Sequence, residues 1–134
     1  PLLRVTATEG WRRVAGLGRG DGVLAAERPG VTLTLQTAAS LDGPACLRVA
    51  VLPTYPAEAG QAWRADLQVG DLTHALSWPR DAQDAAWAQG VLANRLVASV
   101  SLPAVSGPLR LSAGQRDLMF EGAELLPGAC KGNP

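Results

Sequence analysis

The sequence has no excess of charge of either sign. Twelve Lys and Arg residues balance twelve Asp and Glu residues in a chain of 134 residues. Domains that bind nucleic acid or an anionic membrane surface usually carry a clustered excess of basic residues. We therefore expect no nucleic-acid partner and no membrane partner.

Long apolar segments are also missing. The longest run without a charged residue covers residues 96–109, contains Ser, Pro and Gly, and is shorter than the roughly 20 residues of a membrane-spanning helix. No N-terminal targeting segment is recognisable. Because the chain begins at Pro1 instead of Met, we interpret it as a processed or excised piece, and the missing segment carries no information about secretion.

Residues that could carry catalysis or bind a transition metal are sparse. His74 is the only histidine, and it shares strand parity with apolar neighbours, which favours a packed or edge-strand imidazole over a general base. Cysteines at positions 46 and 130 and this one histidine are a poor zinc-ligand set. Asp81 and Asp84 are interpreted as a helix cap and a surface charge. We predict that the chain is not an enzyme by itself.

What the sequence does have is a period-two pattern interrupted by 15 Gly and 10 Pro. Apolar and polar residues alternate most clearly over residues 62–69, as in a strand with one buried face. Short strands are expected near residues 2–7, 11–14, 23–27, 31–36, 47–51, 62–69, 72–78, 96–102, 109–111 and 118–126. Nine or ten such strands predict an all-β, antiparallel, two-sheet β-sandwich that is jelly-roll-like.

The parity of these strands predicts which side chains face the core. The expected core residues are Val31, Leu33, Leu35, Leu47, Val49, Val51, Trp63, Leu67, Val100 and Leu111. Trp11 is expected to pack inside as well. Turn signals recur about every ten residues, so we expect consecutive strands to pair antiparallel.

Two glycine-containing segments predict hairpins. Gly16, Gly18 and Gly20 lack the long helix that a dinucleotide-binding loop requires after its glycines. A short strand follows them instead, so they are interpreted as a hairpin loop, where glycine accepts positive φ values. Gly70-Asp71 predicts a second hairpin turn.

One segment departs from the strand pattern. Residues 80–94 are rich in alanine and begin with Asp81 as a possible N-cap, so we expect a short helix that ends near Gly90 and covers one end of the sandwich. The length fits one domain, which we place at residues 1–127. Residues 128–134 are expected to form a poorly ordered tail.

Cys46 lies in an expected strand and Cys130 in the expected tail. A bridge between them would close a loop of about 85 residues and stabilise the fold by about 4 kcal/mol on a loop-entropy model. Two independent thiols fit the sequence equally well, so the pairing stays open. We expect no cofactor, although loop oxygens of Asp21, Asp42 or Asp71 would suit a structural calcium ion.

Three motifs occur in a characteristic order: Gly10-Trp11 with the turn at Gly16–Arg19, Leu52–Thr54 after a strand, and Trp87 followed by Val91, Leu92 and Asn94. Together, over residues 10–127, the chain resembles the C-terminal β-sandwich domain of family 115 glycoside hydrolases, the xylan α-1,2-glucuronidases. In that family the catalytic carboxylates lie in upstream domains. The resemblance thus implies a non-catalytic accessory domain that docks on the upstream catalytic domains or on a second subunit.

The polysaccharide substrate of that family also implies an extracytoplasmic location, periplasmic or secreted, with which a disulfide would agree. The alternative function is an autonomous carbohydrate-binding module for xylan or glucuronoxylan. Such modules use exposed aromatic side chains as platforms for sugar rings. The candidate sugar-binding residues are Tyr55 between two prolines, Trp78 at a strand end and Trp87 on the expected helix. Docking is preferred, because the sequence shows no clustered aromatic stripe.

Overall fold

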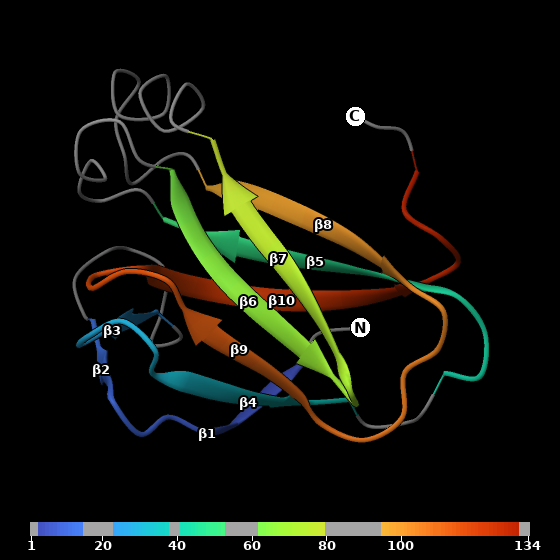
Figure 1. Cartoon of the computed structure of the whole chain (residues 1–134), viewed down its shortest axis with the longest axis horizontal. Helices are drawn as coiled ribbons and strands as arrows, with labels where there is room; N and C mark the ends of the chain where they lie inside the picture. The colour runs from blue at the N-terminus through green and yellow to red at the C-terminus, as the bar shows by residue number, and fades with distance from the viewer. Residues whose placement is uncertain (1–2, 15–22, 38–40, 53–61, 80–94, 132–134) are drawn as a thin grey trace.

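The computed structural model describes residues 3–14, 23–37, 41–52, 62–79 and 95–131. These residues form ten strands in two stacked five-stranded sheets (Figure 1), which confirms the predicted antiparallel sandwich. The strands are β1 (Arg4–Ala7), β2 (Trp11–Arg13), β3 (Leu24–Ala26), β4 (Thr32–Gln36), β5 (Ala45–Val51), β6 (Trp63–Val69), β7 (Leu72–Trp78), β8 (Leu96–Leu102), β9 (Leu109–Ala113) and β10 (Met119–Pro127).

Each sheet is named here by its central strand. The β9 sheet has the order β1-β4-β9-β6-β7, and the β10 sheet has the order β2-β3-β10-β5-β8. Among the described strands, only the β2–β3 and β6–β7 ladders join consecutive strands. The expectation that consecutive strands pair is therefore wrong for the others, because the chain crosses from one sheet to the other at most of its turns.

In both predicted hairpins, the two strands that flank the turn pair with each other. Trp11 pairs with Ala26 across β2 and β3, and the residues between these strands that hold Gly16, Gly18 and Gly20 lie outside the described residues. In the second hairpin, Val69 pairs with Leu72. Gly70 has a φ of 59°, a left-handed conformation that favours glycine in a two-residue turn.

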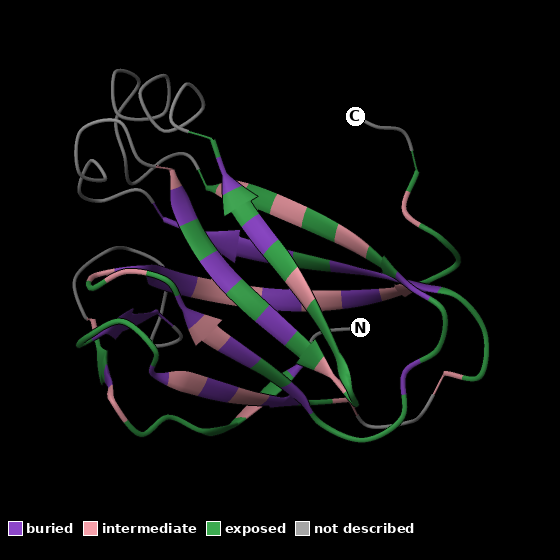
Figure 2. Cartoon of the chain, in the orientation of Figure 1, coloured by how far each residue is buried: buried purple, intermediate pink, exposed green. Residues whose placement is uncertain are grey.

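The core lies between the inner faces of the two sheets. Along β6, buried purple segments alternate with exposed green ones in Figure 2, as in a strand with one face in the core. Nine of the ten predicted core residues are buried, and Trp11 is buried as well. Val100 is only partly buried and packs against the edge of the core. It differs because β8 is an edge strand of the β10 sheet, where neighbouring side chains cover each residue from one side.

The C-terminal segment is held against the sandwich beyond the end of β10. The Gly128 N–H donates to the Pro44 carbonyl at 2.7 Å, and the Cys130 N–H donates to Ser101 Oγ at 3.0 Å. Residues 128–130 therefore differ from the expected loose tail. The predicted helix at residues 80–94 lies outside the described residues. Within the described part of the chain, no helix is long and apolar enough to cross a membrane.

Candidate functional site

Trp78 is a core residue. Its side chain is 1% exposed, and its indole Nε1 donates a hydrogen bond to the Val49 carbonyl of the facing sheet at 3.4 Å. Its parity on β7 turns it inward, so the prediction that Trp78 is an exposed sugar platform is wrong. Tyr55 and Trp87 lie outside the described residues, and a sugar-binding role for them stays a prediction.

The remaining candidates for chemistry that lie among the described residues do not assemble into a site. His74 lies on the edge strand β7 and is partly buried. Its Nε2 has no hydrogen-bond partner among the described residues, in keeping with a packed imidazole. Asp42 and Asp71 are exposed, whereas Asp21, Asp81 and Asp84 lie outside the described residues. The described part of the chain contains no group of three or more His, Cys, Asp or Glu residues that could hold a metal ion, and the calcium site stays a prediction.

A shallow groove of about 260 Å³ lies on the outer face of the β10 sheet, across β5, β10 and β8. Its floor consists of Ala50, Gly122 and Val97, which are neighbours in the sheet because Gly122 pairs with Ala50 and Ala50 pairs with Val97. Val97 is 38% exposed, and among the described residues Leu72 is the other exposed large apolar residue. The floor therefore offers a small apolar surface to a ligand.

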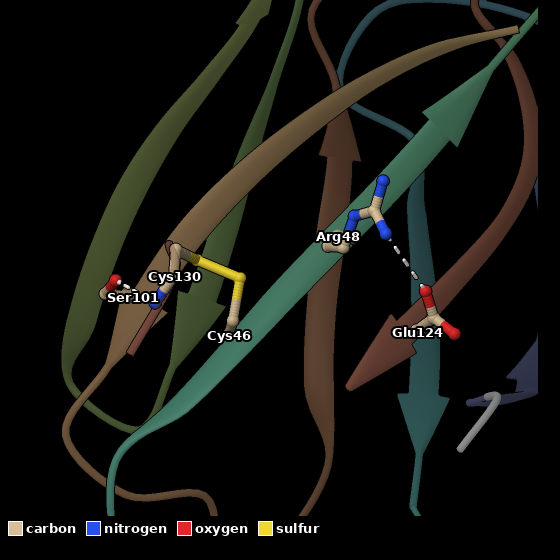
Figure 3. Close-up of a disulfide and its surroundings, with 5 residues drawn as sticks. All are labelled: Cys46, Arg48, Ser101, Glu124 and Cys130. Atoms are coloured by element: carbon tan, nitrogen blue, oxygen red, sulfur yellow. Dashed lines mark hydrogen bonds and ion pairs between the residues drawn. A yellow bond between two sulfur atoms is a disulfide. The ribbon is translucent and has the colours of Figure 1, made fainter. Parts of the chain in front are cut away.

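Two ion pairs border this floor. Arg48 Nη1 lies 3.5 Å from Glu124 Oε1, as Figure 3 shows, and Arg95 Nη1 lies 3.0 Å from Glu121 Oε1. Three of these four side chains are at least 40% exposed, and exposed ion pairs typically stabilise a protein by only about 0–1 kcal/mol. The hydrogen-bonding groups of the three exposed side chains, Arg48, Glu124 and Arg95, can therefore turn toward a ligand at little cost.

A register shift in β10 brings Glu121 to the groove. Phe120 pairs with Val51 and Gly122 pairs with Ala50, so Glu121 is an extra residue on β10. Such bulges redirect side chains and occur often beside functional sites. Phe120 is buried in the core, whereas Glu121 and Gly122 both line the groove. The bulge thus places a carboxylate beside a glycine at the floor of the site.

Gly122 is a glycine that the free domain does not require. A Cβ atom added to it would meet no atom of the described part of the chain within 4 Å, apart from its own chain neighbours, and its φ is not in the left-handed region. A glycine in a strand interior otherwise weakens the strand and often marks a bulge or a close approach by a ligand. The sequence signal that could have pointed to this site is Glu121-Gly122, which interrupts the apolar and polar alternation of the last strand.

The disulfide borders the same face of the sheet. Cys46 and Cys130 are bridged, with an S–S distance of 2.05 Å and a Cα–Cα distance of 4.7 Å, which resolves the alternative that the sequence left open. The bridge fixes the C-terminal segment beside β5 (Figure 3). A second hollow of about 510 Å³ lies here, and Arg48 lines both it and the groove, so the two are adjacent.

No protein-family model matches this sequence, and no curated protein sequence matches it. Among solved structures, the fold is similar to part of BtGH115A, a family GH115 4-O-methyl-α-glucuronidase described as specific for decorated arabinogalactans, with a TM-score of 0.66 and 17% identity. The match covers 93% of this chain and 17% of that enzyme. The chain therefore spans a small part of the enzyme's length.

Two further solved structures are similar over nearly their whole length. The CBM35 from Cellvibrio japonicus Abf62 has a TM-score of 0.60, 18% identity and 98% coverage of both chains. Xyl-CBM35, solved in complex with a glucuronic acid containing disaccharide, has a TM-score of 0.55, 18% identity, and coverage of 100% of this chain and 99% of that one. At these low sequence identities, the structural similarity shows only a shared fold. This fold is the β-sandwich that was expected from the resemblance to a family 115 domain.

Proposed function

We propose that this chain is a non-catalytic accessory domain of a polysaccharide-degrading enzyme and that it binds carbohydrate in the groove of the β10 sheet. The observation that carries the proposal is the arrangement of the groove, in which two ion pairs border a floor of Ala50, Gly122 and Val97. Sugar rings present apolar C–H faces and hydroxyl groups that donate and accept. The floor suits the C–H faces, and the ion pairs suit the hydroxyls.

The solved structures of similar fold support this proposal. The CBM35 structures are carbohydrate-binding modules by name, and they correspond to the present chain over nearly their full length. The glucuronidase BtGH115A contains the same fold as 17% of its chain. A domain of this fold therefore occurs both as a binding module and as a piece of a larger carbohydrate-active enzyme.

The direct test is isothermal titration calorimetry of the isolated domain with a panel of neutral and uronic-acid-bearing oligosaccharides. We expect at least one member of the panel to bind with a dissociation constant of about 1 mM or tighter, equivalent to about −4 kcal/mol. Matched titrations of Arg48→Ala and Glu124→Ala should show weaker binding. If no oligosaccharide of the panel binds, the proposal is wrong.

Docking on other domains of the parent enzyme is the second candidate function. It is favoured by the similarity to a 17% portion of a much longer enzyme. The described surface gives it less support, because Leu72 and Val97 are the exposed large apolar residues there and the centres of protein interfaces are usually richer in such residues. Binding of the isolated domain to the purified remainder of its parent enzyme, without binding to any sugar, would favour docking.

We also propose an extracytoplasmic location, periplasmic or secreted. The Cys46–Cys130 disulfide supports it, since disulfides persist mainly in oxidising compartments. Fractionation of the native host, followed by detection of the domain with an antibody, tests this proposal. Recovery in the cytoplasm with both cysteines reduced would contradict it.

A further inference from the structure

We infer that the groove accommodates uncharged sugar residues of a glycan main chain, and that Gly122 is the position that determines whether a ring can lie in it. This inference rests on the proposed carbohydrate-binding function and adds the class of ligand and a specificity-determining residue. Three observations carry it: the charge balance of the groove, its length along the strands, and the empty space above Gly122.

Among the described residues, the charges that border the groove cancel. Arg48 Nη1 lies 3.5 Å from Glu124 Oε1, and Arg95 Nη1 lies 3.0 Å from Glu121 Oε1. A uronic acid would have to displace one of these carboxylates from its arginine and then face it as a like charge. An uncharged hydroxyl instead accepts from the guanidinium and donates to the carboxylate, so each pair can bind it without being broken.

The two ion pairs stand far enough apart to border more than one ring. Arg48 pairs with Ser99 across β5 and β8, and Arg95 precedes Ser99 by four residues, which is about 13 Å along an extended strand. The small residues Ala50 and Gly122 and the exposed Val97 occupy the stretch between them. A short segment of a linear glycan lying along the strands fits this layout better than a single terminal sugar does.

Gly122 keeps this stretch open. A side chain at position 122 would point into the groove that Gly122 lines, because a Cβ atom built there meets no atom of the described residues within 4 Å, its chain neighbours aside. In a strand interior, glycine is less stabilising than alanine, and β-branched residues are the better strand formers. A larger residue should therefore fit the free domain without loss of stability and obstruct a sugar ring.

The test compares Gly122→Val with Gly43→Val, its matched control. Like Gly122, Gly43 has open space at its Cβ and lacks a left-handed φ. Gly43 is exposed, whereas Gly122 is partly buried, and Gly43 does not line the groove. Each protein is titrated by calorimetry with linear xylo-, cello- and β-1,3-galacto-oligosaccharides and with 4-O-methylglucuronate-substituted xylo-oligosaccharides. Melting temperatures are measured in parallel, and Gly122→Ala is included as the smaller substitution.

We expect the wild type and Gly43→Val to bind a neutral oligosaccharide equally well and with little dependence on salt. Gly122→Val should bind at least about tenfold more weakly, with a melting temperature equal to or above that of the wild type. Gly122→Ala should weaken binding less. This combination of kept stability and lost binding is not expected of a residue with only a structural role.

The failures can be told apart. If the wild type binds no oligosaccharide, the proposed function and this inference both fall. If Gly122→Val and Gly122→Ala bind like the wild type, this inference and the placement of the sugar in the groove are wrong, while carbohydrate binding by the domain stands. If only the glucuronate-bearing oligosaccharides bind, or if binding weakens steeply with salt, the assignment to uncharged sugars is wrong while carbohydrate binding stands.

Discussion

Leu67 on β6 illustrates how single residues hold the two sheets together. Its side chain is completely buried in the core cluster. We expect Leu67→Ala to lower the free energy of unfolding by about 2–5 kcal/mol, because the truncation removes buried apolar contacts and leaves a cavity. Urea denaturation of the variant and the wild type measures the change, and a loss below about 1 kcal/mol would contradict the inward orientation of this position.

Trp78 gives a second prediction at the same scale. Because the ring is buried and its Nε1 donates to the Val49 carbonyl, Trp78→Ala should lower the free energy of unfolding by about 3–5 kcal/mol. The milder Trp78→Phe should leave the domain folded and its sugar affinity unchanged. If Trp78→Phe keeps its melting temperature and loses sugar binding, this prediction is wrong and Trp78 contributes to the binding site.

Trp78 also shows why the burial of a single residue is hard to predict from the sequence. Its position before Pro79 at a strand end fitted an exposed platform, and its parity with Leu76 fitted the core. Parity decided the outcome, because the side chain faces the other sheet across the sandwich. Leu72 has the same parity and yet is 56% exposed, since it lies beside the hairpin turn at the margin of the sheet.

At the scale of elements, the strands follow from the sequence and their partners do not. Period-two alternation and turn residues act locally, and the structure has all ten expected strands. The choice of partner depends on which sheet each strand enters, as when β10 lies between β3 and β5. The groove depends on this pairing, because the bulge at Glu121 exists only relative to β5.

The Cys46–Cys130 bridge provides a prediction for the C-terminal element. The bridge spans 84 positions of sequence, and a loop of this length corresponds to a stabilisation of about 4 kcal/mol on the chain-entropy model. We expect the double variant Cys46→Ala/Cys130→Ala to unfold at a markedly lower urea concentration. After reduction with dithiothreitol, the wild type should resemble the variant, and equal stability of the oxidised and the reduced wild type would contradict this expectation.

At the scale of the whole molecule, the proposed carbohydrate-binding accessory domain is expected to catalyse no hydrolysis. Glu121 and Glu124, the carboxylates of the groove, are each held in an ion pair with an arginine. The isolated domain should therefore release no product from 4-O-methylglucuronoxylan oligosaccharides, as measured by chromatography after removal of contaminating enzymes. Turnover that disappears in Glu121→Gln or Glu124→Gln would refute the accessory role.

The central claim is that the outer face of the β10 sheet binds carbohydrate. The most direct test follows the backbone amide resonances of the isotope-labelled domain while a neutral linear oligosaccharide is added. The account predicts that the shifts are concentrated at Ala50, Val97 and Gly122 and at the neighbouring Arg48 and Glu124. Shifts confined to the β9 sheet or to the segments between strands, with the groove unchanged, would contradict it.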